Sequence, residues 1–93
     1  MTIVYFSKPA ERDLKSLSRP ATEKFQAELK HLEANPRVGK ILHGPLRGYF
    51  SYDFWSGGVS YRAAYEIVKG SVIILMVDAR DNFYKKFSRR IEI

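Results

Sequence analysis

The stretch that decides the fold is YRAAYEIVKGSVIILMVDARDNFY, residues 61–84. Within it, Val72–Val77 is an uninterrupted apolar run, which predicts a strand that is covered on both faces or central in its sheet. Lys69–Gly70 precedes the run and matches a two-residue hairpin turn, where glycine can adopt positive φ. The candidates for chemistry are the polar residues at the margins of the stretch, Arg62, Arg80 and Tyr84.

Two more strands complete a meander around this run. Val59–Val68 alternates with period two, which places Arg62 on the side opposite the tyrosines. Tyr49–Phe54 alternates aromatic and polar residues with the same period, and Trp55–Gly58 is the predicted turn between these strands. The third strand is Ser71–Ala79. Because the connections are too short for a parallel crossover, the three strands are expected to be antiparallel.

The N-terminal part predicts a strand followed by two helices. Thr2–Phe6 is short, β-branched and aromatic, as strands are. Ser7 and Ser18 each stand two residues before a proline, a helix-start signal with a hydroxyl cap and a proline in the first turn. Asn35–Pro36 ends the second helix. The expected buried stripes of the two helices are Ala10, Leu14 and Leu17, and Ala21, Phe25, Leu29 and Leu32.

The remaining segments are a connector and a C-terminal helix. Residues 37–48 contain three glycines and a proline, which argues against regular structure. We expect Ile41, Leu42 and Leu46 of this connector to reach the core. Asp81 is expected to cap the last helix, with Phe83 and Phe87 docking on the sheet.

These elements define one α+β domain over residues 1–93, in the order β-α-α-β-β-β-α. The predicted architecture is an N-terminal strand and an αα-hairpin packed on a four-stranded, largely antiparallel sheet, with a short C-terminal helix. The helical hairpin covers one face. The other face is expected to stay open, with the connector and the last helix at its rim.

Composition narrows the function classes. The 93 residues include no cysteine and two histidines, which removes thiolate chemistry and makes a metal site unconvincing. The N-terminus lacks the pattern of a signal peptide, and no apolar run reaches the ~20 residues of a membrane span, so we expect a cytoplasmic protein. The net charge of +6 favours polyanionic partners such as nucleic acid.

Once these classes of site are excluded, the remaining candidate residues are of types that suit phosphate chemistry without a metal or other cofactor. No Ser-His-Asp set and no phosphate-loop pattern is suggested. An RNA 2′-hydroxyl can attack its adjacent phosphate if arginines stabilise the charge that develops, while other groups accept and donate a proton. Arg62, Arg80 and Tyr84 are suitable types. The alternative is structural: Arg62 pairs with Glu66 or Asp78, and Tyr84 is a packing aromatic.

The order of motifs resembles the RelE/ParE superfamily of toxins from type II toxin–antitoxin pairs. The resemblance covers essentially the whole chain, favours the RelE-like branch, and rests on Leu46-x-Gly48, Tyr61-Arg62-x-x-Tyr65-x-Ile67, Val72–Leu75 and Arg80-Asp81-x-x-Tyr84. It implies a toxin that enters the ribosomal A site and cleaves mRNA without a metal, inhibiting translation. It also implies a cognate antitoxin that wraps the toxin and displaces or covers its C-terminal helix.

Site residues follow from the same resemblance. It gives Arg62, Arg80 and Tyr84 catalytic positions. The strand 49–54 departs from the RelE pattern, because Ser51 and Asp53 stand where lysines or arginines are usual. Asp53 is then either a general base or a charge that repels phosphate. The alternative function is a gyrase inhibitor like ParE, or a degenerate toxin that only binds antitoxin and nucleic acid.

Basic residues outside the catalytic set are candidates for contacting RNA or the ribosome. Those in the connector can line a groove, although ordinary solvated loop charge is the favoured interpretation of each; they are Lys40, His43 and Arg47. Those at the C-terminal end follow Tyr84 directly, where anion contacts would orient it, and alternatively keep the helix soluble; they are Lys85, Lys86, Arg89 and Arg90.

Overall fold

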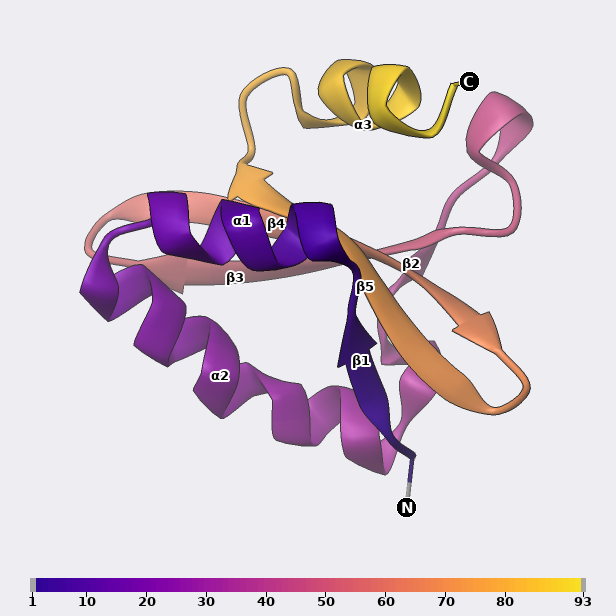
Figure 1. Ribbon diagram of the computed structural model, residues 1–93, viewed down its shortest axis with the longest axis horizontal. Coiled ribbons are helices and arrows are strands. Elements are labelled where there is room, and N and C mark those ends of the chain that lie inside the picture. Colours follow the sequence, from indigo (N-terminus) through magenta and orange to yellow (C-terminus); the bar gives the residue numbers. More distant parts are fainter. Residues whose placement is uncertain (1, 93) are drawn as a thin grey trace.

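The structure is a computed structural model that describes residues 2–92. Its helices and strands are β1 (Val4–Phe6), α1 (Lys8–Ser16), α2 (Arg19–Ala34), β2 (Lys40–Ile41), β3 (Phe50–Ser56), β4 (Val59–Val68), β5 (Ser71–Ala79) and α3 (Phe83–Ile91). The sheet order is β1-β5-β4-β3-β2, with β1 parallel to β5 and the other pairs antiparallel (Figure 1). The predicted α+β class and order of elements are confirmed.

The prediction of four strands is wrong by one. Lys40–Ile41, inside the connector expected to be irregular, forms β2 and pairs with Phe50 and Ser51 of β3. Short 3₁₀ turns at Pro36–Val38 and Gly44–Leu46 flank it. The connector is therefore irregular except for a two-residue strand at the edge of the sheet.

Both predicted helix starts are confirmed. The backbone N–H of Ala10 donates to the Ser7 hydroxyl at 3.2 Å, and that of Ala21 donates to the Ser18 hydroxyl at 3.3 Å. Each serine thus satisfies an N–H that has no partner within its helix. Asn35 ends α2 as expected, since its backbone leaves the helical region before Pro36.

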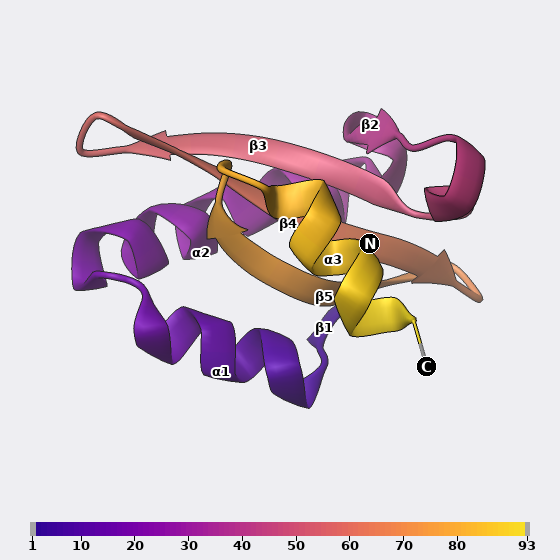
Figure 2. The same cartoon turned by 90° about the horizontal axis from the view of Figure 1, so that it is seen from above.

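The sheet is packed on both faces, so the expectation of an open second face is wrong. Figure 1 shows α3 on the side of the sheet opposite α2, and Figure 2 shows it lying across β4 and β5. The helical hairpin packs on one face through a core that includes Phe25, Leu32 and Tyr65. On the other face, Phe83 and Phe87 of α3 are buried against Ala64 and Met76, as their spacing predicts.

A β-bulge in β5 explains why its apolar run is uninterrupted. The β4–β5 register pairs Tyr65 with Ile74 but Ala64 with Met76, so Leu75 has no partner residue. Ile74 packs with the helical hairpin, Leu75 and Met76 both pack on the α3 side, and Val77 returns to the hairpin side. A strict period of two is broken there, and both faces of the strand receive apolar side chains.

Several local expectations are corrected. Of the three connector residues expected in the core, Leu42 is buried and Leu46 packs partly buried against the α3 side, but Ile41 on the edge strand β2 is 53% exposed. Asp81 does not cap α3: the cap position is Asn82, which adopts left-handed backbone dihedrals (φ 55°) and makes no side-chain cap hydrogen bond. Trp55 was assigned to a turn, but β3 continues through it, which leaves only Gly57 and Gly58 to reverse the chain.

Two tyrosine hydroxyls join the sheet to the elements around it. Tyr52 donates to Glu28 of α2 at 2.7 Å, and Tyr65 donates to the Pro36 carbonyl at 2.7 Å. The Tyr65 hydroxyl in turn accepts the Gly39 N–H at 3.0 Å. Glycine is required at that position, because a Cβ would lie 2.5 Å from the Tyr65 hydroxyl oxygen. Burial, reinforced for Tyr52 by the Glu28 carboxylate, raises the pKa of both tyrosines.

These shifts predict alkaline destabilisation. A tyrosine pKa that is higher in the folded state adds stability below the unfolded value of about 10, and this stability is lost as pH rises above it. Tyr52→Phe is expected to lower the free energy of unfolding at pH 7 by about 1.5–3 kcal/mol, through loss of the bond to the charged Glu28. It should also flatten the decline above pH 10.

Urea unfolding at several pH values between 7 and 11 measures both effects. The matched control is Tyr5→Phe, which removes a hydroxyl from a tyrosine that is 51% exposed and should leave the free energy of unfolding at pH 7 nearly unchanged. An equally steep alkaline decline in wild type and Tyr52→Phe would contradict the assignment.

Candidate active site

The antiparallel register of β3, β4 and β5 aligns polar residues in rows on the face that carries α3. Because side chains alternate along a strand, every second residue of β3 and β4 points to this face. From the covered part of the face outward, the rows are Ser51, Ala64 and Met76, then Asp53, Arg62 and Asp78, then Trp55, Ser60 and Arg80.

Arg62 lies at the centre of the middle row and is bound by its neighbour Asp53. The Nε–H of Arg62 donates to Asp53 Oδ1 at 2.7 Å, and a terminal N–H donates to Oδ2 at 3.3 Å. The Arg62 side chain is 13% exposed and that of Asp53 is 56% exposed. The hydrogen bond that Arg62 donates to Asp53 raises the pKa of Arg62, against the opposing effect of burial. The structural alternative of a pair with Glu66 or Asp78 is wrong, since Asp53 is the partner.

Tyr84 closes the site from α3. The Arg62 guanidinium carbon lies 4.6 Å from the centroid of the Tyr84 ring, within cation–π range. The Tyr84 hydroxyl is 3.1 Å from the hydroxyl of Ser51, which is buried. The preceding residue, Phe83, is buried against the sheet and fixes the first turn of α3. Arg62 on β4 thus contacts both Asp53 on β3 and Tyr84 on α3.

Arg80 emerges where β5 gives way to α3. Its backbone N–H donates to the Ser60 carbonyl at 3.0 Å, which continues the β4–β5 ladder by one pair. Its side chain lines an open hollow of about 570 Å³ together with Arg62, Ser60 and Asp81. Among residues 2–92, no carboxylate lies within 4.0 Å of its guanidinium. Arg80 is therefore the cation at this site that is available to an incoming anion.

The predicted connector residues divide between two hollows. Lys40 and His43 line one of about 260 Å³ that also contains Tyr84. Arg47 lines another of about 450 Å³, on the far side of the 3₁₀ turn, with Ser88 of α3. The structure brings Lys40 and His43 beside the catalytic candidate Tyr84, and it places Arg47 apart from them.

The C-terminal cations are not equivalent. Lys86 pairs with Asp78 at 3.3 Å. Arg90 forms a double hydrogen bond with Asp13 of α1, at 2.6 and 3.0 Å, and also donates to the Leu75 carbonyl. Lys85 and Arg89 are exposed. No local signal in the sequence links Asp13 to a residue 77 positions later.

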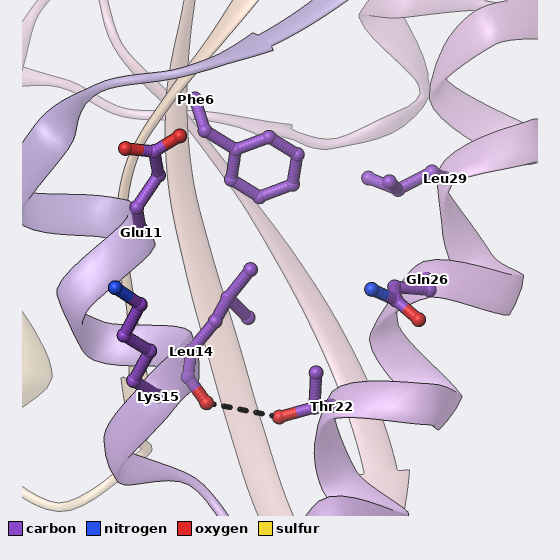
Figure 3. A pocket seen from close by; sticks show the side chains of 7 residues that line it. All are labelled: Phe6, Glu11, Leu14, Lys15, Thr22, Gln26 and Leu29. Carbon is purple, nitrogen blue, oxygen red and sulfur yellow. Dashed lines mark hydrogen bonds between the residues drawn. The ribbon is translucent and has the colours of Figure 1, made fainter.

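A fourth hollow lies between α1 and α2. Figure 3 shows its seven lining residues, with Phe6 of β1 at one end and apolar Leu14 and Leu29 facing each other from the two helices. Its volume is about 530 Å³. The Thr22 hydroxyl donates to the Leu14 carbonyl at 3.0 Å and ties the helices together. Its few polar side chains do not converge on one point, so this groove is a packing feature rather than a catalytic centre.

Residues 2–92 contain no group of three or more histidine or acidic side chains placed to hold a metal ion. None of the helices in this range is long and apolar enough to cross a membrane.

Known proteins of one toxin superfamily are similar to this chain in sequence and in fold. A family model for the ParE-like toxin of type II bacterial toxin–antitoxin systems matches residues 4–88. A chain of the RelBE2 toxin–antitoxin complex of Mycobacterium tuberculosis is 35% identical and has a TM-score of 0.73, covering 85% of this chain and 98% of that one. No curated protein sequence matches significantly.

More distant structures share the fold. A mutant of the Escherichia coli toxin RelE in the free state is 17% identical with a TM-score of 0.75, and the match covers 97% of each chain. YafQ of Escherichia coli is 12% identical with a TM-score of 0.65, covering 90% of this chain and 99% of that one. The chain therefore belongs to the ParE-like toxin family of type II toxin–antitoxin systems. Within the RelE/ParE superfamily it falls in the RelE-like branch, as its motifs predict.

Proposed function

We propose that this toxin is a ribosome-dependent mRNA endoribonuclease that needs no metal and is held in check by a cognate antitoxin. The observation that carries the proposal is the joint contact of Arg62 with Asp53 and with the Tyr84 ring, beside Arg80, which has no ion-pair partner in residues 2–92. A proton acceptor, two phosphate-binding cations and a hydroxyl donor thus lie on one face. These are the groups that cleavage of RNA by its own 2′-hydroxyl requires.

The proposed reaction is an in-line transesterification. The 2′-oxygen attacks the adjacent phosphorus and loses its proton to the Asp53 carboxylate. Arg62 and Arg80 stabilise the additional negative charge on the phosphorane, because guanidinium groups grip phosphate in a bidentate way. The bond from phosphorus to the 5′-oxygen breaks as the Tyr84 hydroxyl donates a proton to that oxygen. The products are a 2′,3′-cyclic phosphate and a 5′-hydroxyl.

The partners follow from the charge and the family. The net charge of +6 suits ribosomal RNA around the A site. The proposed contacts with ribosomal RNA are Lys40 and His43, which line the hollow at Tyr84, and Lys85 and Arg89, which are exposed on α3, with Arg47, Lys86 and Arg90 at the margin. The similar RelBE2 chain belongs to a toxin–antitoxin complex, which supports an antitoxin partner here. A ribosomal target would place the protein in the cytoplasm.

Asp53 tests the proposal, because its two roles predict opposite results. As the general base, Asp53→Asn should lower the rate of mRNA cleavage on programmed ribosomes by about 100-fold or more. Asparagine keeps the size and one hydrogen bond to Arg62, so the fold should persist. The cleavage rate in a purified translation system is the measurement, with Glu66→Gln as the control on the same sheet. Faster cleavage in Asp53→Asn would mean that the carboxylate only neutralises Arg62.

A second candidate function is gyrase inhibition. It is favoured by the pairing of Arg62 with Asp53, which removes much of its charge from an incoming phosphate. Expression of the toxin with and without its neighbouring antitoxin gene distinguishes the two functions. Arrest of translation with normal DNA supercoiling would support the nuclease, and altered supercoiling with continuing translation would support gyrase inhibition.

A further inference from the structure

The outer row of the site contains an exposed tryptophan that the proposed chemistry does not use. Trp55 is 61% exposed, the most exposed of the large apolar side chains in residues 2–92. It follows Ser51 and Asp53 at two-residue spacing along β3, so it points to the same face as Arg62. No other aromatic ring in the described chain stacks on it.

The backbone pairing of Trp55 fixes the point at which its side chain leaves the sheet. Trp55 pairs with Ser60 across the β3–β4 ladder, and the Ser60 carbonyl accepts the backbone N–H of Arg80 at 3.0 Å. Gly57 and Gly58, both with positive φ, close the hairpin directly beyond. The Cα atoms of Trp55 and Arg80 are therefore separated by two strand spacings, about 10 Å, and the small residue Ser60 lies between them.

A hollow occupies the space above that serine. Its volume is about 270 Å³, and its lining includes Trp55, Ser60, Arg80 and Asp53. The nearer carboxylate, Asp53, is already bound by Arg62, whereas Arg80 has no acidic partner in residues 2–92. Asp81 lines only the neighbouring hollow around Arg80. An indole ring and an available guanidinium thus face one open space from its two sides.

We propose that Trp55 and Arg80 form a subsite for one nucleotide of single-stranded RNA, with the base stacked on the indole and its phosphate at the guanidinium. This inference rests on the proposed function and extends it to a nucleotide beside the cleaved bond. Stacking on an aromatic side chain tolerates any base, because every base has a π face. The subsite therefore positions the RNA strand along the row without selecting its sequence.

The chain provides its own probe, since Trp55 is its single tryptophan. A short single-stranded RNA, added to the full-length toxin, is expected to quench Trp55 fluorescence. An abasic oligomer of the same length, with the same phosphates and no bases, is expected to bind weakly and leave the fluorescence unchanged. Equal quenching by the abasic oligomer would overturn base stacking. Quenching by the co-purified antitoxin but not by RNA would overturn the RNA subsite and assign Trp55 to the protein partner.

Affinity measured with a labelled RNA completes the test. Trp55→Ala should weaken RNA binding about 5- to 150-fold, and Trp55→Phe should restore part of the loss. Tyr5→Ala is the matched control, because Tyr5 is an exposed aromatic outside these rows. Unchanged binding by Trp55→Ala would refute the subsite. Cleavage on ribosomes is scored separately: binding that depends on Trp55 without cleavage refutes the nuclease alone, and cleavage indifferent to Trp55→Ala refutes the subsite alone.

Discussion

Replacing Tyr84 by phenylalanine is expected to lower mRNA cleavage on the ribosome by about 100- to 10,000-fold, the usual contribution of a general acid. The change removes only the hydroxyl that lies 3.1 Å from Ser51. The ring stays against the Arg62 guanidinium, so the cation–π contact and the docking of α3 are retained. Single-turnover cleavage of a ribosome-bound message is the measurement, because it isolates the chemical step from product release.

The control for this substitution is Tyr5→Phe, which removes an exposed hydroxyl at the far edge of the sheet. It should cleave like the wild type. Ribosome binding should be nearly equal for all three proteins, since the lost interaction acts on the leaving oxygen. Tyr84→Phe with wild-type cleavage would show that the tyrosine is a packing aromatic, the structural alternative that the sequence leaves open.

The second large effect is expected for Arg80→Ala, with a loss of about 100- to 1,000-fold in the cleavage rate. Arg80 is exposed and has no ion-pair partner in residues 2–92, so its removal should leave the free energy of unfolding unchanged. Arg80→Lys should recover only part of the rate, because an ammonium group cannot grip two phosphate oxygens in one plane.

Arg12→Ala is the matched control for charge, because it removes one cation from the exposed side of α1. Thermal unfolding of both variants checks the fold, and single-turnover cleavage checks the site. If Arg80→Ala and Arg12→Ala cleave equally well, the phosphate is stabilised elsewhere and Arg80 is an ordinary surface charge.

Local sequence signals account for most of the fold. Ser7 and Ser18 indicate the starts of the two helices. This signal can be read from the sequence because a cap bonds to residues within one helical turn. The β3–β4–β5 meander follows from period-two alternation and short connections, which act over neighbouring residues. The two-residue strand β2 and the position of α3 were mispredicted, because each depends on contacts with segments distant in sequence.

The site could be predicted in its residue types but not in its pairings. Arg62 and Tyr84 are indicated by their motif, and the structure places them in contact. The partner of Arg62 is Asp53, whose position opposite it depends on the register of two strands and not on any pattern within one. Trp55 was wrongly assigned to the turn. The turn needs only Gly57 and Gly58, so β3 continues through Trp55.

The bulge at Leu75 divides β5 into two halves with different tasks. If the alternation continued unbroken from Ile74, Arg80 would point into the helical hairpin and not toward Arg62. The extra residue therefore changes which face the following side chains point to. The half of β5 before it contributes to the core, and the half after it directs Arg80 toward the site. In the evolution of such toxins, this strand should tolerate exchanges of one apolar residue for another far better than a change in its length.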